Sequence, residues 1–226
     1  MRVVEPDEIE RLLGAASERY RPLLATAVFT GLRLGELLGL VWADVDFEGG
    51  LIKVRKQLAR TGERVEPKTT QALRDVVLMP ALCRVLREHK LKTGYSQGTD
   101  FVFPSLTGTP LQARNLARRA LGKALAQGEL SADGKPGLRF HDLRHTFASL
   151  LIAERLDVVF VSRQLGHANP SITLSVYAHL FDRARHAERT RDALEASFGA
   201  LLETAADPGR SAVVGKGSNV VTLPGF

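Results

Sequence analysis

The sequence predicts an α+β fold, mainly helical with a small antiparallel β-sheet. Apolar residues recur every three or four positions over most of the chain, which is typical of amphipathic helices. Between residues 45 and 79 the period changes, and short strand-like runs alternate with glycine turns. With 226 residues and 44% hydrophobic content, the chain is long enough to bury a sizeable core.

Helices are expected at the N-terminal end of the chain. Pro6 begins the first, and two acidic residues follow in its first turn, where negative charge suits the helix dipole. A second helix is expected from Pro22 to Thr30, with Gly31 marking its end. A third starts near Arg33 and turns its leucines inward.

The sheet is expected to come next. Four short strands are predicted at Val45–Phe47, Leu51–Arg55, Arg64–Glu66 and Arg74–Met79. Glycine-containing turns separate them, and Pro80 begins another helix.

The second half of the chain returns to helical spacing after a loop from Thr93 to Pro110. Five helices are predicted, at Leu111–Ala126, Asp142–Arg155, Val158–Leu165, Ser171–Leu180 and Ala184–Thr204. Ser131 to Gly137 forms a further loop. The last stretch, Ala206–Phe226, lacks helical periodicity and is predicted to be a flexible tail.

The charge balance is basic, with 31 Lys and Arg against 25 Asp and Glu, and the isoelectric point is near 9.8. Gathered on one face, this charge would attract a nucleic acid, and spread evenly it would form an ordinary solvated surface. One predicted helix carries four cations that favour the first alternative: Arg114, Arg118, Arg119 and Lys123.

Other classes of protein are disfavoured by composition. The longest apolar run, from Pro22 to Leu32, is too short to span a bilayer, so no membrane partner is expected. Cys83 is the single cysteine, so no intramolecular disulfide can form, and a reducing cytoplasm fits best. Cys83 itself is predicted to lie on a buried helix face.

Two segments carry side chains suited to a phosphate. In His141-Asp142-Leu143-Arg144-His145, at a predicted helix start, His141 and Arg144 project from the same side. In Thr30-Gly31-Leu32-Arg33, a glycine turn delivers Arg33 to another helix start, where Glu36 can hold its guanidinium. Taken alone, each pattern also fits an ordinary capped helix.

A metal site is the alternative for the histidines. His141 and His145 have the spacing of a zinc pair, and His167 is a possible third ligand. However, Asp142 stands where the HExxH pattern requires glutamate. His145 is interpreted as a core histidine with a satisfied hydrogen bond, so no metal is expected.

Taken in order, these segments resemble the tyrosine recombinase or phage integrase family. The resemblance rests on Thr-Gly-Leu-Arg with Glu36, His-Asp-Leu-Arg-His-Thr-Phe-Ala, Leu-Gly-His, and Thr173 four residues before Tyr177. It covers about Glu5 to Leu180. Several spaced motifs in register are more specific than any one of them.

The resemblance implies a set of catalytic residues: Arg33, Lys68, His141, Arg144, His167 and Tyr177, supported by Glu36 and His145. Tyr177 would attack a DNA phosphate, leaving a 3′-phosphotyrosyl link and a free 5′-hydroxyl. The two arginines would bind the phosphate oxygens, so neither a metal, a cofactor nor ATP is required. Cations near the phenol are expected to ease its ionisation.

The remaining assignments follow the same resemblance. His141 and His167 would handle protons and bind the phosphate, and Lys68 would protonate the leaving oxygen. Lys68 matches a lysine that the family places on a strand turn. Lys53 and Lys56 are the alternatives if the register differs.

Partners and domain boundaries are likewise implied by the resemblance. The expected partners are double-stranded DNA, further copies of the chain up to a tetramer, and accessory DNA-bending or directionality proteins. Residues 1–205 would form the catalytic domain and 206–226 the tail. Because only Met1–Val4 precede the first helix, the family's N-terminal DNA-clamping (core-binding) domain is expected to be absent.

The resemblance also suggests a setting and a docking element. A bacterial or phage-encoded cytoplasmic protein associated with the nucleoid is expected, from a prophage or mobile element. Either Ala184–Thr204 or Val220–Leu223 could dock on a neighbouring copy. Two alternatives remain, a protein that only binds DNA and a type IB topoisomerase-like enzyme that relaxes supercoils.

Overall fold

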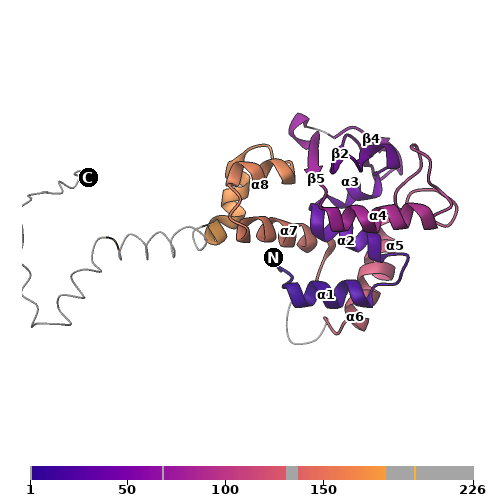
Figure 1. Cartoon of the computed structure of the whole chain (residues 1–226), viewed down its shortest axis with the longest axis horizontal. Coiled ribbons are helices and arrows are strands. Elements are labelled where there is room, and N and C mark those ends of the chain that lie inside the picture. The colour runs from indigo at the N-terminus through magenta and orange to yellow at the C-terminus, as the bar shows by residue number, and fades with distance from the viewer. Residues whose placement is uncertain (1, 68, 131–136, 182–195, 197–226) are drawn as a thin grey trace, which may run out of the picture. The chain divides into compact units, whose positions relative to one another are not determined.

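A computed structural model describes residues 2–67, 69–130, 137–181 and residue 196 (Figure 1). Residues Met1–Ala184 form one compact unit. Several predictions lie outside the described residues: Lys68, the loop over 131–136, the tail, and the helix from Ala184 to Thr204 except for residue 196.

The N-terminal helices confirm the sequence prediction closely. They are α1 (Pro6–Ala15), α2 (Arg21–Thr30), α3 (Leu34–Leu38) and, after the strands, α4 (Pro80–Lys92). A proline opens α1, α2 and α4 in the first turn, where its missing N–H has no helical partner to lose. Helix α2 is buried along most of its length, and α1, α3, α4 and α7 all pack against it (Figure 1).

The sheet has three antiparallel strands in the order β1-β2-β5. They are β1 (Val45–Asp46), β2 (Leu51–Val54) and β5 (Arg74–Val77). A separate hairpin joins β3 (Gln57–Leu58) to β4 (Arg64–Val65). The sequence prediction missed β3, because two residues with no buried side chain leave no alternation to detect.

The sequence predicted one regular helix over the basic segment, Leu111–Ala126. The structure has three joined helical pieces there instead. α5 (Ala113–Leu116) and α6 (Lys123–Gln127) flank a π-helical turn, Ala117–Gly122. Leu116 and Leu121 are buried against the core. The predicted DNA-contacting cations are exposed on the outside of this segment: Arg114, Arg118, Arg119 and Lys123.

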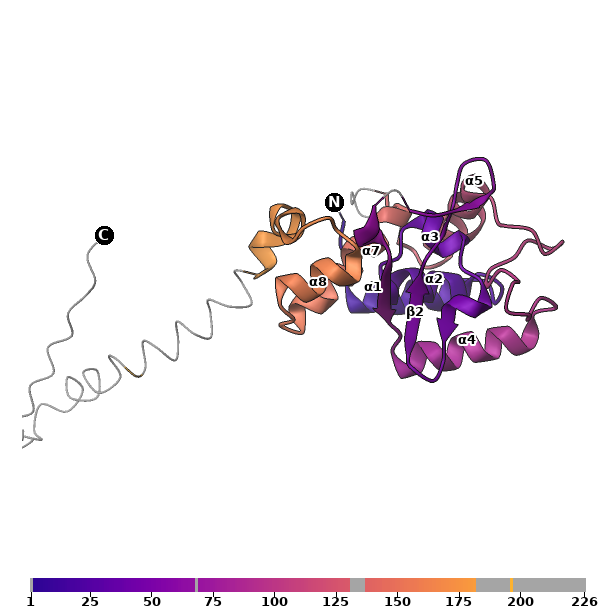
Figure 2. The same ribbon diagram turned by 90° about the horizontal axis from the view of Figure 1, so that it is seen from above.

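The C-terminal helices form a group of their own. α7 (Phe140–Ala153) packs across α2, and α8 (Val158–Leu165) packs on α7 and β5. Residues 170–181 are also helical, and Figure 2 shows this orange segment beside α8. Within the described ranges, no helix is both long and apolar enough to cross a membrane.

Among the described residues, buried apolar side chains form two clusters. The larger one unites α1 to α4, the sheet and the basic segment with the start of α7. The smaller one lies between α7, α8 and the 170–181 helix, and contains Phe147, Ala148, Ile152, Val161, Leu165, Tyr177 and Phe181. Cys83, predicted to be buried, is only partly buried on α4.

Candidate active site

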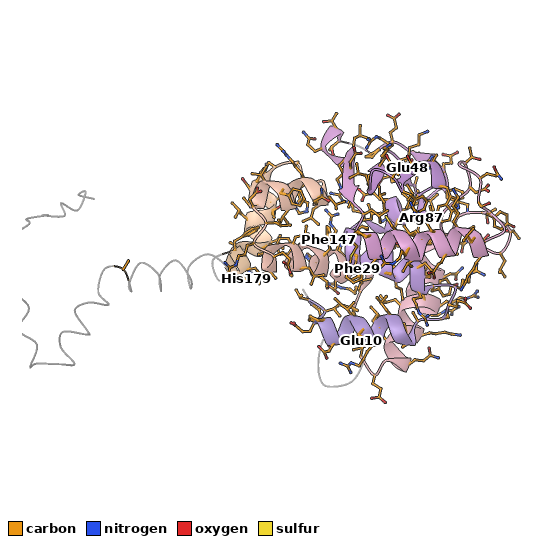
Figure 3. All side chains as sticks on the ribbon, in the orientation of Figure 1. Glu10, Phe29, Glu48, Arg87, Phe147 and His179 are labelled. Atoms are coloured by element: carbon orange, nitrogen blue, oxygen red, sulfur yellow. The ribbon has the colours of Figure 1, made fainter. Side chains whose placement is uncertain are left out.

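Arg33 is positioned by the sharp end of α2. Gly31 adopts a left-handed conformation there, with φ of 59°. A Cβ at this position would lie 2.4 Å from Cδ1 of Phe147, a residue labelled in Figure 3, so only glycine fits. The chain then re-enters a helix at α3, and Arg33 Nη1 donates to Glu36 Oε1 at 2.8 Å. The side chain of Arg33 stays 38% exposed.

Arg144 is held in the interior by backbone oxygens. It lies on α7 and is only 4% exposed. Its Nη1 donates to the carbonyl of Gly31 at 2.7 Å, and its Nη2 donates to the carbonyl of Leu165. Burial, with the nearby charges of Arg33 and Arg74, lowers the pKa of Arg144 to about 9. The guanidinium therefore remains protonated at neutral pH.

Three arginines contact three consecutive carbonyls at the end of α8. Arg74 Nε donates to Gln164 O at 2.7 Å. Arg144 donates to Leu165 O, and Arg33 donates to Gly166 O at 2.8 Å. The last carbonyls of a helix carry its negative dipole end, so positive charge is favourable there. We call this set of three arginines and three carbonyls the arginine clamp.

Arg74 is the member of the clamp that the sequence prediction missed. It occupies a buried position of β5, on the same face as Val76. Its Nη1 and Nη2 donate to the two carboxylate oxygens of Glu36 at 3.0 and 2.9 Å. The available signal was an arginine on the apolar face of a predicted strand, which is costly unless a buried partner compensates it.

Glu36 links two arginines of the clamp, because its carboxylate contacts both Arg33 and Arg74. Burial would raise the pKa of Glu36, but the hydrogen bonds and charges of Arg74 and Arg33 outweigh it and hold that pKa below its usual value. Glu36 is thus an ionised, 2% exposed bridge between two guanidinium groups.

His167 is delivered by a glycine turn at the end of α8. Gly166 has φ of 63°, and the N–H of His167 donates back to the carbonyl of Ser162 at 3.1 Å, as in a Schellman motif. Nδ1 of His167 lies 2.8 Å from Oγ1 of Thr173. Burial and the charges of three arginines, Arg144 first, lower the pKa of His167 to about 4.

Tyr177 is buried in the smaller cluster and is 2% exposed. Its hydroxyl lies 2.6 Å from Nδ1 of His145. Burial raises the pKa of Tyr177 to about 12, although the charge of Arg144 opposes this. The charge of Arg144 acts in the expected direction, but the loss of solvent outweighs it, so the phenol is harder to ionise than a free tyrosine.

His145 is more than the core histidine that the sequence suggested, because its hydrogen-bond partner is the hydroxyl of Tyr177. Its ring meets that of the exposed His141 edge to face, with centroids 4.8 Å apart. Burial is the first cause that lowers the pKa of each of these histidines. In the part of the chain that the structure describes, no three His, Cys, Asp or Glu residues gather as a metal site would require.

The lysine assignment stays a prediction, since Lys68 lies outside the described residues. Of the alternatives, Lys53 on β2 forms an ion pair with Asp46 at 3.0 Å, and Lys56 is exposed. The basic segment borders a cleft of about 820 Å³, whose lining includes Arg118, Arg119 and Lys123.

Comparison with known proteins points to one family. The model described as the phage integrase family matches residues 2–184. A tyrosine recombinase XerC-like protein of Caldanaerobacter subterraneus is 32% identical over 204 residues, covering 79% of this chain and 50% of that protein. A putative prophage phiRv2 integrase of Mycobacterium tuberculosis is 30% identical over 189 residues, covering 82% of this chain and 47% of that protein.

The solved structures agree with this. The Tn1549 transposon integrase, in complex with circular intermediate DNA, superposes with a TM-score of 0.72 at 25% identity. That match covers 84% of this chain and 66% of the integrase. The chain spans about half the length of the curated relatives above.

Proposed function

This chain belongs to the phage integrase family, and we propose that it is the catalytic part of a site-specific DNA recombinase that cuts and rejoins strands through Tyr177. The fold expected from the resemblance is confirmed by the solved structures that it matches. The roles of individual residues and the covalent intermediate belong to the proposal.

The observation that carries the proposal is the arginine clamp beside a buried tyrosine. Arg33, the α7 pair His141 and Arg144, His167 and Tyr177 come from four separate segments, between residues 33 and 177. Even so, Arg33 and Arg144 bind adjacent carbonyls next to His167, and the charge of Arg144 acts on the phenol of Tyr177. Two guanidinium groups, two imidazoles and a phenol are a set suited to phosphoryl transfer without a metal.

Arg33 and Arg144 would bind the scissile phosphate through the N–H groups that form no hydrogen bond within the clamp. Each terminal nitrogen of a guanidinium carries two N–H groups. Arg33 uses one on Glu36 and one on Gly166. The others can donate to phosphate oxygens, where charge builds up in the pentavalent transition state. One such contact typically contributes about 3–4 kcal/mol, or two to three decades in rate.

The reaction would conserve the energy of the phosphodiester. The oxygen of Tyr177 attacks phosphorus and gives up its proton to a histidine of the site, the bond to the 5′ oxygen breaks, and that oxygen takes a proton from Lys68. The product is a 3′-phosphotyrosyl link and a free 5′-hydroxyl. A hydroxyl of another strand can reverse the step without ATP, because one phosphate ester has replaced another.

DNA binding would extend to the basic segment. Arg114, Arg118, Arg119 and Lys123 are exposed there, and such cations position a protein on the phosphate backbone rather than read its bases. Assembly up to a tetramer on double-stranded DNA, and help from accessory DNA-bending or directionality proteins, are part of the same proposal. So is a cytoplasmic setting at the bacterial nucleoid.

The test uses a nicked suicide duplex whose cleaved end diffuses away, so that the covalent product accumulates. Labelled duplexes from the flanks of the chain's own gene are mixed with the protein in EDTA. We expect a denaturant-stable protein–DNA adduct with the wild type and none with Tyr177→Phe. An adduct that persists in Tyr177→Phe overturns the assignment of the nucleophile.

Two other results point to the alternative functions. Salt-sensitive binding without an adduct on every duplex would favour a binding-only protein. Relaxation of supercoiled plasmid by an adduct-forming protein, independent of paired sites, would favour the topoisomerase-like reaction.

A further inference from the structure

We propose that His145 accepts the proton of the Tyr177 hydroxyl when that oxygen attacks phosphorus. This inference rests on the proposed function and assigns the nucleophile's proton to a residue that the resemblance leaves in a supporting role. It moves the handling of this proton to His145 from His141 and His167, to which the resemblance gives it together with binding of the phosphate.

The geometry of the pair supports direct proton transfer. Nδ1 of His145 lies 2.6 Å from the hydroxyl oxygen of Tyr177, within the reach a general base needs. The ring centroids are 5.7 Å apart, with an interplanar angle of 58°. His145 directly follows Arg144 on α7, so the base and one phosphate-binding cation are adjacent in the chain.

A base is required because this tyrosine does not ionise beforehand. Its side chain is 2% exposed, so bulk water is a poor proton acceptor for it. With a pKa of about 12, about one molecule in 10⁵ would carry the phenolate at pH 7. Removing the proton during the attack avoids that rare species.

The surroundings of His145 keep it neutral and therefore able to accept. Burial lowers its pKa, and His141 and Arg144 act in the same direction, whereas Asp142 opposes them. From the 170–181 helix, Tyr177 itself faces the ring. In the required tautomer Nε2 carries the hydrogen and Nδ1 is the acceptor.

One proton leaves the tyrosine and another reaches the 5′ oxygen in the cleavage step. The phenol oxygen forms its bond to phosphorus, its proton moves to Nδ1 of His145, and the ring becomes an imidazolium. The bond from phosphorus to the 5′ oxygen breaks, and that oxygen takes a proton from an acid on the other side, the role given to Lys68. In rejoining, His145 returns the proton to the departing tyrosine.

The first experiment reads the tautomer and needs no DNA. Nitrogen NMR of the full chain with ¹⁵N-labelled histidine is assigned by His145→Asn, which is practical with six histidines. We expect His145 as the Nε2–H tautomer at neutral pH. A hydrogen on Nδ1, with the ring donating to the tyrosine oxygen, overturns the proposal.

The second experiment measures single-turnover cleavage of a duplex that the wild type cleaves. His145→Asn keeps a polar group near Nδ1 but cannot take a proton, so we expect the rate to fall about 10²–10⁴-fold. Folding and DNA affinity should be unchanged. The matched control is His179→Asn, an exposed histidine on the same helix as Tyr177 (Figure 3), which should cleave like the wild type.

The pH profile separates proton transfer from mere positioning. If His145 acts as the base, the asparagine variant loses the acidic limb of the wild-type rate profile. A variant that cleaves within threefold of the wild type with the same profile overturns the role of His145. In that case the adduct still forms, so the proposed function survives. Absence of an adduct in the wild type would instead contradict the proposed function.

Discussion

The arginine clamp and the pair formed by Tyr177 and His145 are built in opposite ways. The clamp ties β5, α3, α7 and α8 together through ion pairs and backbone hydrogen bonds. Tyr177 depends on one side-chain hydrogen bond and on the smaller apolar cluster. The arginine clamp, which we propose to bind the phosphate, is therefore fixed by polar contacts between several elements, whereas Tyr177, the proposed nucleophile, is held by apolar packing and the hydrogen bond to His145.

Removing Glu36 should have the largest effect, because it leaves two guanidinium groups without their shared counter-charge. For Glu36→Ala we expect a loss of about 3–5 kcal/mol in the free energy of unfolding, measured by urea denaturation. Glu10→Ala, an exposed glutamate on α1 labelled in Figure 3, is the control and should change little. Equal stability of the two variants would mean that Glu36 does not hold the clamp together.

Arg144→Lys tests the clamp's role in catalysis. Lysine keeps the charge but cannot reach two carbonyls and a phosphate with one planar group. Single-turnover cleavage should fall about 10²–10³-fold, equivalent to about 3–4 kcal/mol. The hydrogen bond between Tyr177 and His145 should remain, visible as an unchanged His145 nitrogen spectrum. If that spectrum changes as well, the arginine clamp and the pair formed by Tyr177 and His145 are coupled more closely than their contacts suggest.

The pH dependence of stability should also report on the clamp. The folded pKa of His167, about 4, lies below its reference value of 6.5. The unfolded chain therefore binds the proton first, so this contribution is fully present above pH 6.5 and is lost as the pH falls toward 4. The difference between these two pKa values corresponds to about 3.4 kcal/mol, and since His167 is only partly buried, solvent screening should reduce the loss across this window to about 2 kcal/mol.

Thermal unfolding at several pH values measures this effect. His167→Asn should flatten the curve between pH 6.5 and 4 but not abolish its slope, because His141 and His145 also have lowered pKa values. An unchanged slope in the variant would show that His167 is not shielded from protonation.

The helices and the motif residues could be predicted from the sequence because each gives a signal within a few neighbouring positions. Helical spacing, an opening proline and a closing glycine lie within a few neighbouring positions, and Val158–Leu165 was predicted with the bounds that α8 has. The same locality explains why Gly31 could be interpreted as the turn that delivers Arg33 to the next helix.

Contacts between distant segments could not be predicted in that way. Arg74 lies 90 residues before the carbonyl that it binds, and His145 lies 32 residues before Tyr177. Similarly, the raised pKa of Tyr177 depends on how much solvent the folded chain excludes, which no motif encodes. The sequence predicted which groups are present but not which of them touch.

Tyr177→Phe should have the smallest effect on stability and thereby sharpens the contrast between the two halves. The change keeps the ring in the smaller cluster and removes one hydroxyl, so the free energy of unfolding should fall by about 0.5–1.5 kcal/mol. His145 is only partly buried, so water can replace the lost donor at its Nδ1. Cleavage should nevertheless vanish. A variant with nearly wild-type stability and no adduct would show that the Tyr177 hydroxyl contributes little to the stability of the fold. A loss above 3 kcal/mol in the free energy of unfolding would instead show that this hydroxyl stabilises the fold as strongly as the clamp does.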